Sequence, residues 1–278
     1  MQKTATTRPV PYFRGPGEVA FGIQPVLTEG HTAEGAMRLG EWALYGDGSG
    51  VHQGATGVLI DDTTAYAALT ARSADQWGVS TEISVDFHAP IPVDAGRLIC
   101  TATADHSSAG WGHSTGEVRA DTGELIATVG QRMRFFPGDD SPHRQDPQPA
   151  DAPSWLTSLD SHLELAEQSG TRSEFLLRVD PGMRNPMGML HGGISLGFSE
   201  LAARKAWEQS ENFPGEPFRT ASLRMSYLRP GVLDGDLRIV VDIIHSSRSV
   251  VLAEVCIRNA DGSAATFGLA TLHRVATM

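Results

Sequence analysis

The chain has 278 residues and carries 22 Lys and Arg residues against 33 Asp and Glu residues, for a formal net charge of -11. This acidic balance argues against a nucleic-acid or membrane-surface partner, because both would need basic patches. No apolar run at the N-terminus or elsewhere is long enough to span a bilayer, so we expect a cytoplasmic protein. Its 2 cysteines, Cys100 and Cys256, predict reduced structural thiols and neither a disulfide framework nor a metal site.

The first half of the chain predicts a strand, a long helix and further strands. Residues Ala36–Gly40 have the pattern of a strand. Apolar residues then recur at helical spacing from His52 to about Arg72, which predicts a helix. Two strand-like runs follow on either side of a turn at Asp121–Gly123. The segment Pro137–Pro153 is too rich in proline and charge to pack, so it predicts a linker.

The second half repeats this order. A strand-like segment at Phe175–Val179 precedes a helix predicted from His191 to about Trp207. Three alternating runs rich in β-branched residues follow at Leu237–Ile244, Val250–Ile257 and Ala264–Leu272. One long helix beside several antiparallel strands indicates the α+β class, with a sheet that covers the helix.

Several landmarks recur at one offset along the chain. His191 follows His52 by 139 residues, and the strand-like segment Ala221–Pro230 follows Thr81–Pro90 by 140 residues. A constant offset of half the chain length indicates a duplicated domain. We therefore predict a first domain at residues 1–136, a linker at 137–153 and a second domain at 154–278.

A histidine–glycine motif opens the predicted helix of the second half. The motif is Asn185-x-x-Gly188-x-x-His191-Gly192-Gly193, and Glu200 follows nine residues after the histidine. With the Tyr227–Pro230 segment and the Ser247-Arg248 hairpin, it resembles the hotdog-fold acyl-CoA thioesterases, especially the phenylacetyl-CoA thioesterase-like group. The first half resembles this family more weakly, through His52-x-Gly54, Asp61 and Phe87–Pro90.

The resemblance implies both an architecture and an activity. The fold would be two tandem hotdog domains, each a long helix wrapped by a curved antiparallel sheet, packed as a pseudo-dimer with one continuous sheet. The activity would be hydrolysis of an acyl-CoA thioester to free acid and CoA at the interface of the two halves. Coenzyme A is then part of the substrate, no cofactor or metal is expected, and the chains are expected to form homo-oligomers.

The motif also has chemistry that suits this reaction. The N-terminus of a helix offers free backbone N–H groups and a partial positive charge. Gly192 and Gly193 carry no side chain that would block a ligand, so an N–H group there could stabilise the oxyanion of a thioester carbonyl. Glu200 could act as a general base on water or as a direct nucleophile, and the sequence leaves both routes open.

The resemblance further pairs each acid with a hydroxyl group on the facing half. The hydroxyl positions are Ser80 and Thr220, so Glu200 is expected to face Ser80 and Asp61 to face Thr220. The halves are not equivalent, because Gly46, Ser49 and Gln53 stand in the first half where Asn185, Gly188 and Gly192 stand in the second. We therefore expect Glu200 to be the principal catalytic carboxylate, with Asn185, His191, Gly192 and Ser80 in the same site.

The phosphates of coenzyme A need local cations in an acidic protein. Arg248 is the first candidate and Arg229 the second, whereas strand alternation puts Arg224 on a different sheet face from Arg229. The remaining expected substrate-binding residues are the motif positions Gly188, Gly193, His52 and Gly54.

Two other functions stay open at this stage. Asp47 and His52 resemble the acid–histidine dyad of hotdog enoyl-CoA hydratases, although Pro186 stands where the aspartate of the second half should be. A non-catalytic acyl-CoA binding protein would keep the cavity and lose the chemistry. Two local alternatives also stay open, since His191 could simply cap its helix and Asp62 could be the solvent-facing acid in place of Asp61.

Overall fold

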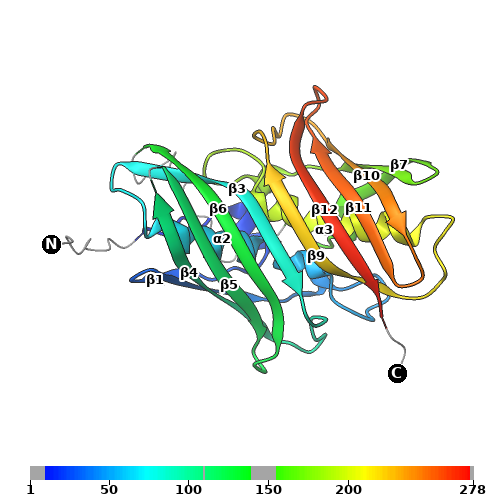
Figure 1. The fold of residues 1–278 in the computed structure, drawn as a ribbon, viewed down its shortest axis with the longest axis horizontal. Coiled ribbons are helices and arrows are strands. Elements are labelled where there is room, and N and C mark those ends of the chain that lie inside the picture. Colours follow the sequence, from blue (N-terminus) through cyan, green and yellow to red (C-terminus); the bar gives the residue numbers. More distant parts are fainter. Residues whose placement is uncertain (1–9, 109, 139–154, 276–278) are drawn as a thin grey trace.

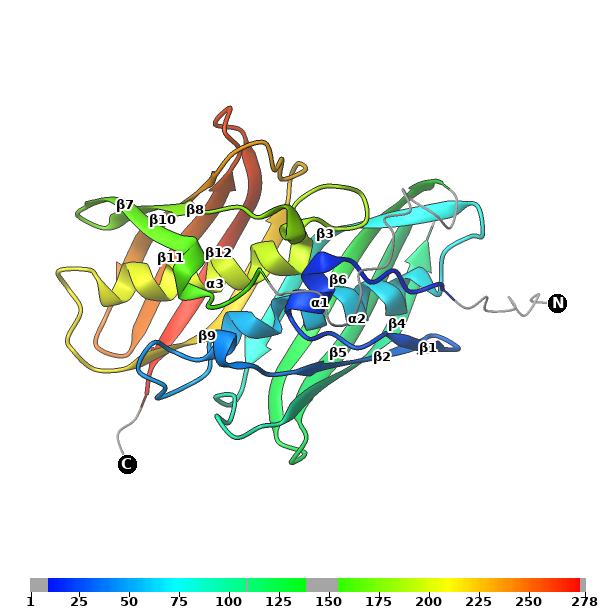
Figure 2. The same cartoon turned by 180° about the vertical axis from the view of Figure 1, so that it is seen from behind.

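The computed structural model describes residues 10–108, 110–138 and 155–275. They form one 12-stranded antiparallel sheet with helices against one of its faces, seen from the sheet side in Figure 1 and from the helix side in Figure 2. The α+β class expected from the sequence is confirmed. Within the described ranges, none of the helices has both the length and the apolar character needed to cross a membrane. Cys100 and Cys256 are free thiols.

Both halves contribute two strands, a long helix and four further strands in the same order, and the first half has the short helix α1 in addition. The first half holds α1 (Pro16–Ala20), β1 (Leu27–Glu29), β2 (Thr32–Arg38), α2 (Gly57–Leu69), β3 (Gln76–Phe87), β4 (Arg97–Ser108), β5 (Trp111–Ala120) and β6 (Leu125–Pro137). The second half holds β7 (Leu163–Ser169), β8 (Arg172–Leu177), α3 (Gly192–Glu208), β9 (Phe218–Tyr227), β10 (Leu237–Ser246), β11 (Val250–Arg258) and β12 (Ala264–Arg274). Among the described residues, four short 3-10 helices lie between these elements: η1 (Glu41–Ala43), η2 (Gln53–Thr56), η3 (Asp160–His162) and η4 (Pro181–Met183).

The sheet is symmetric about its centre. Its strand order is β1-β2-β4-β5-β6-β3-β9-β12-β11-β10-β8-β7, so each strand has a counterpart at the same distance from the join. At the join β3 pairs antiparallel with β9, with Val85 opposite Leu223. The predicted duplication and the predicted continuity of the sheet are therefore confirmed. The predicted linker at 137–153 lies outside the described residues apart from its first two positions, and the domain boundaries stay predictions.

The two long helices approach each other through glycines. A Cβ atom added at Gly57 of α2 would lie 2.2 Å from the carbonyl oxygen of Gly193 in α3. A Cβ atom added at Gly54 of η2 would lie 2.3 Å from the carbonyl oxygen of Gly197. Only glycine leaves room for such close backbone contact. The contact brings the first turns of both helices together, and with them the residues that the sequence singles out.

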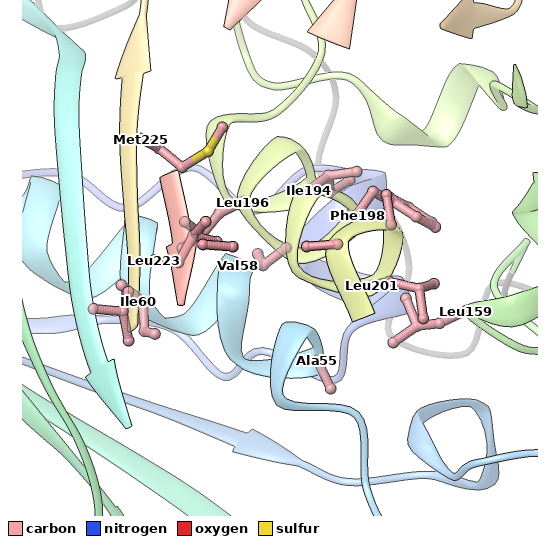
Figure 3. Close-up of a cluster of buried hydrophobic side chains, with 14 of the residues drawn as sticks. Ala55, Val58, Ile60, Leu159, Ile194, Leu196, Phe198, Leu201, Leu223 and Met225 are labelled. Atoms are coloured by element: carbon pink, nitrogen blue, oxygen red, sulfur yellow. The ribbon is translucent and has the colours of Figure 1, made fainter. Parts of the chain in front are cut away.

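Apolar side chains of both helices fill the space between the helices and the sheet. Val58 and Ile60 of α2, Ile194 and Phe198 of α3 and Leu223 of β9 belong to one buried cluster, part of which is drawn in Figure 3. Complete burial of such a side chain stabilises the fold by about 1.5–3 kcal/mol. The cluster therefore holds the helix contact, and the site beside it, in a fixed geometry.

Candidate functional site

A cavity of about 290 Å³ lies at the contact between the two helices. Asp61 of α2 and Ser80 of β3 line it from the first half, and Asn185, His191 and Gly192 line it from the second half. The cavity thus joins an acid and a hydroxyl group of one half to the histidine–glycine motif of the other.

Asp61 is one of three acids that line this cavity, with Glu18 and Asp62, and only 6% of its surface is exposed. Its Oδ1 atom accepts hydrogen bonds from Ser80 Oγ at 2.9 Å and from Gln131 Nε2 at 3.0 Å. Its Oδ2 atom accepts a hydrogen bond of 2.8 Å from the backbone N–H of Gly193. Gln131 Nε2 also donates to Ser80 Oγ at 2.6 Å, so the three side chains form one closed network.

The surroundings of Asp61 favour its ionised form. Burial raises the pKa of Asp61, but hydrogen bonds and charge from His191, with further hydrogen bonds from Ser80 and Gly193, bring that pKa below its usual value. The position of the carboxylate at the N-terminus of α3 acts in the same direction, because helix N-termini stabilise negative charge. The cavity therefore contains a carboxylate that is ionised at neutral pH.

His191 lies among three carboxylates. Its Nδ1 atom is 3.2 Å from Asp61 Oδ2, and its Nε2 atom is 3.2 Å from Asp62 Oδ1 and 3.5 Å from Glu18 Oε1. Burial lowers the pKa of His191, but hydrogen bonds to these acids outweigh it and hold the pKa well above its usual value. The N–H of Gly193 lies 3.0 Å from Nδ1 and 2.8 Å from Asp61 Oδ2. We assign that N–H to the closer acceptor, the charged Asp61 Oδ2 atom, which leaves Nδ1 of His191 free to carry a proton. His191 is therefore an imidazolium that donates to Asp61 and holds it in place.

Asp62 also lines the cavity and is as buried as Asp61, so exposure does not distinguish the two acids. Its Oδ2 atom accepts a hydrogen bond of 3.1 Å from the hydroxyl group of Tyr12. Burial and the charge of Glu18 raise the pKa of Asp62 to about 7, although His191 opposes this. Glu18, Asp62 and His191 each offer one ligand atom within 4.8 Å of the others, which is close enough to hold a metal ion. In the structure the imidazolium supplies the positive charge between these two acids.

The second half presents hydrogen-bond donors to the cavity. Gly192 is the first residue of α3, and its N–H group has no hydrogen-bond partner among the described residues. Tyr227 donates its hydroxyl proton to the carbonyl oxygen of Gly192 at 2.8 Å and so fixes the peptide that follows. Asn185 Oδ1 accepts from the N–H groups of Met187 and Met189 at 2.9 and 3.1 Å. The Nδ2 group of Asn185 has no partner within the described part of the chain, so it is available to a ligand.

Gly188 and Gly193 shape the motif and do not line the cavity. Gly188 has a φ of 79°, in the left-handed region that favours glycine, and its N–H donates to the Asn185 carbonyl oxygen at 2.9 Å. A Cβ atom added at Gly193 would lie 2.5 Å from the Gly57 carbonyl oxygen. The absence of a side chain at Gly193 therefore allows the two helices to approach each other. The sequence had suggested instead that it leaves room for a ligand.

Glu200 lies outside this cavity, which corrects the expectation that it shares a site with Asn185. It is 1% exposed and accepts hydrogen bonds from Thr220 Oγ1 at 2.6 Å and from the N–H of Gly54 at 3.0 Å. The expected pairs of Glu200 with Ser80 and of Asp61 with Thr220 are therefore wrong. Each long helix packs on the strand that follows it in the same half, so its acid meets the hydroxyl group of that strand. The hydrogen bonds that join the two halves are those from backbone N–H groups: Gly193 donates to Asp61, and Gly54 donates to Glu200.

His52 and Gly54 also lie outside the cavity. His52 is fully buried, with its Nε2 atom 3.2 Å from Asp160 Oδ2 and its Nδ1 atom 3.0 Å from Arg204 Nη2. Asp47, the other residue of the suggested hydratase dyad, accepts hydrogen bonds from the N–H and the hydroxyl group of Ser49. The two residues of that dyad thus belong to separate hydrogen-bond networks.

The three candidate phosphate-binding arginines lie in different places. Arg229 lines the cavity and is exposed. Arg248, the first candidate from the sequence, lines a separate depression together with Glu216 and Arg274. Arg224 is paired with Asp86 across the join of the sheet, at 2.6 Å. Arg229 is therefore the one candidate that the structure brings to the cavity.

One part of the cavity wall is apolar and aromatic. It consists of five lining residues that belong to one hydrophobic cluster: Phe13, Tyr66, Leu69, Trp77 and Met133. The Phe13 ring meets the Trp77 ring edge-on at a centroid distance of 6.0 Å, and the backbone N–H of Phe13 donates to the Tyr66 hydroxyl group at 3.0 Å. A ligand in this cavity would meet apolar side chains at one part and the guanidinium of Arg229 at another.

Two residues of the site were not predicted from the sequence. Gln131 is 1% exposed on the buried face of β6, beside Val129 and Met133. A polar residue on the core face of an alternating strand is a signal that could have found it. Glu18 gives no such signal, because it reaches His191 from a helix of only 5 residues far away in the sequence. Tyr227 packs against the buried cluster and also lines the cavity.

Two family models match the chain. The model described as "Thioesterase superfamily" matches residues 187–266, and the model described as "Acyl-CoA thioesterase C-terminal domain" matches residues 6–135. No curated protein matches the sequence.

Solved structures similar to this chain include three full-length neighbours. The acyl-CoA thioesterase II TesB2 from Mycobacterium marinum is 13% identical with a TM-score of 0.64, and the match covers 94% of this chain and 97% of that one. The tesB protein from Mycobacterium avium subspecies paratuberculosis is 12% identical with a TM-score of 0.63, covering 90% and 96%. A hot dog fold protein of unknown function from Alicyclobacillus acidocaldarius is 17% identical with a TM-score of 0.63, covering 94% and 98%. Identities this low show a shared fold.

Proposed function

This chain belongs to the hotdog-fold thioesterase superfamily in its tandem form, and from that premise we propose that it hydrolyses an acyl-CoA thioester to the free acid and CoA. The observation that carries the proposal is the presence of an ionised, buried Asp61 and the unpaired N–H of Gly192 in one cavity. A carboxylate can drive attack on a carbonyl carbon, and a free N–H at a helix N-terminus can stabilise the resulting oxyanion.

In the proposed reaction the thioester carbonyl oxygen accepts hydrogen bonds from Gly192 N–H and Asn185 Nδ2. Asp61 either attacks the carbonyl carbon directly or takes a proton from the water that does so. One water is consumed, the C–S bond breaks, and CoA leaves as the free thiol. Ser80 and Gln131 hold Asp61 in place, a role supported by their hydrogen bonds to its Oδ1 atom.

The orientation of the substrate follows from the two kinds of surface in the cavity. We propose that the acyl group lies against the apolar and aromatic part of the wall and that the phosphates of CoA lie near Arg229. The chain has a net charge of -11, so phosphate groups need a local positive charge, and the exposed guanidinium of Arg229 at the cavity provides one. The aromatic side chains of Tyr66 and Trp77 give an acyl group an apolar environment.

We also propose that the protein works in the cytoplasm as a homo-oligomer of double-hotdog chains. Exposed apolar side chains on the strands support association, among them Trp111 at 47%, Ile244 at 49% and Phe267 at 41% exposure. Light scattering at micromolar concentration tests the assembly. A strict monomer would contradict the oligomer and would leave the proposed chemistry unaffected.

A panel of acyl-CoAs of different chain length, with aromatic and enoyl members, tests the proposed activity. The full chain should release free thiol from at least one of them above the rate without protein, followed with a thiol-reactive dye. The enoyl absorbance is recorded in parallel. Loss of that absorbance without thiol release would identify a hydratase. Binding of the panel with neither signal would identify a non-catalytic acyl-CoA binding protein, and either result would overturn the proposal.

A further inference from the structure

A second set of matching groups surrounds Glu200. Its carboxylate accepts one hydrogen bond from the Thr220 hydroxyl group and one from the N–H of Gly54, as the Asp61 carboxylate does from its own hydroxyl and N–H partners. In both centres the hydroxyl group comes from the same half as the acid, and the N–H comes from the other half. Glu200 follows Asp61 by 139 residues, so the two centres are copies produced by the duplication.

The two centres differ at the position one helical turn after the acid. Ala65 lines the open cavity beside Asp61, whereas the counterpart of Ala65 beside Glu200 is Arg204. Residues four apart on a helix are neighbours on one face, so the Arg204 side chain extends beside Glu200. Arg204 is only 8% exposed. A large side chain therefore fills interior space where the first centre has a small one.

Three partners hold the guanidinium of Arg204. Its Nη2 atom lies 3.0 Å from His52 Nδ1, its Nη1 atom donates to Glu208, and its central carbon lies 4.6 Å from the centre of the Tyr45 ring. The side chain of Glu208 is 36% exposed. The guanidinium of Arg204 thus lies between the buried His52 and the partly exposed Glu208, and its side chain occupies the space between them and Glu200.

Arg204 and Gln53, the residue before Gly54, each carry a polar group without a hydrogen-bond partner. Gln53 Nε2 and Arg204 Nε are buried and unpaired within the described residues. Gln53 stands where the first centre has Gly192, and it is 4% exposed. Buried polar groups are almost always hydrogen-bonded in folded proteins, so these two unpaired groups need a physical reason. A polar binding site whose ligand space is filled by a side chain provides that reason.

We propose that the Glu200 centre is a second site for a CoA thioester that the Arg204 side chain closes, so that each chain has one open site. This inference rests on the function proposed for the Asp61 cavity. The closed centre keeps an acid, a hydroxyl group and a backbone donor, but it has Ala270 where the first centre has Gln131. Once opened, it should bind the same class of ligand and turn it over more slowly.

The number of ligands bound per chain tests the closure. A non-hydrolysable CoA thioether, titrated calorimetrically into the full chain, should bind once per wild-type chain and twice per Arg204→Ala chain. Arg204→Met is the matched control, because it removes the charge and keeps most of the volume, and it should still bind once. The reciprocal variant Ala65→Arg should close the first cavity and bind no ligand.

Turnover gives a second readout. In an Asp61→Asn background, Arg204→Ala should raise the rate of thiol release by about 10-fold, and a further Glu200→Gln change should remove that gain. One ligand per chain in folded Arg204→Ala would overturn the closure, and so would two ligands in the wild type or in Arg204→Met. If circular dichroism shows that Arg204→Ala does not fold, Ala65→Arg decides, since retained binding overturns the proposal and lost binding supports it. No binding to the wild type would instead refute the proposed function itself.

Discussion

Asp61→Asn removes the negative charge from the cavity and keeps the size of the side chain. In the native chain, donors from Ser80, Gln131, Gly193 and His191 surround the carboxylate. An asparagine has one acceptor oxygen, and its NH₂ group replaces the second carboxylate oxygen. The donors that faced that second oxygen then lose their acceptor. Each hydrogen bond to a charged acceptor that is lost is worth about 1.5–3 kcal/mol. Loss of a positioned base or nucleophile costs at least about 100-fold in rate, or about 2.7 kcal/mol of activation free energy. We expect kcat/KM to fall by at least that factor.

Thiol release from the best acyl-CoA of the panel is the assay, and Glu200→Gln is the matched control. The control makes the same chemical change in the equivalent acid of the closed centre, so kcat/KM should change by less than about threefold, or about 0.7 kcal/mol. Thermal unfolding checks that both variants fold. A larger loss for Glu200→Gln than for Asp61→Asn would refute the assignment of the chemistry to the Asp61 cavity, and would restore the expectation drawn from the sequence.

The other residues around the cavity give further expectations. Gly192→Ala should lower kcat strongly, because the added Cβ atom would lie 2.7 Å from Asp61 Oδ2. Unchanged kinetics would contradict that geometry. Asn185→Asp keeps the acceptor of its loop and loses the Nδ2 donor, so kcat should fall by about 10²–10³-fold with an unchanged melting temperature. Arg229→Ala should raise KM for acyl-CoA, whereas Arg248→Ala should leave KM unchanged, since Arg248 lines a different depression. The pKa of Asp62 is raised to about 7, which disfavours its ionised form in the folded chain, so the free energy of unfolding should fall as pH rises towards neutrality. Urea titrations near about pH 5 and about pH 8 should show this fall, and Asp62→Asn should lessen it. The raised pKa of His191 acts in the same direction above about pH 6.5, so part of the fall should remain.

The local elements of the fold could be predicted because their signals are local. The helix predicted from His191 to about Trp207 is α3, Gly192–Glu208, and the alternating run Val250–Ile257 lies in β11. The helix of the first half starts at Gly57, after a 3-10 turn, and its predicted start at His52 was several residues early. A single turn changes its hydrogen-bond pattern without changing the spacing of apolar residues, so periodicity does not locate such a boundary.

Most residues of the site could be predicted from the sequence, but which of them contact each other could not. Asn185, His191 and Glu200 lie on one segment at a regular spacing, which favoured the prediction that they share one site. In the structure the first turn of α3 meets α2 through Gly57 and Gly193, so the motif faces the acid of the other helix. That contact depends on how two helices far apart in the sequence pack, and one sequence alone does not contain this information.

The location of the thioester carbonyl tests most directly where the chemistry occurs. A crystal structure of Asp61→Asn with a bound acyl-CoA should place the carbonyl oxygen within hydrogen-bond distance of the Gly192 backbone nitrogen, with the acyl group against Tyr66 and Trp77. A carbonyl group bound beside Glu200, or an acyl-CoA bound outside the cavity, would contradict the proposed site.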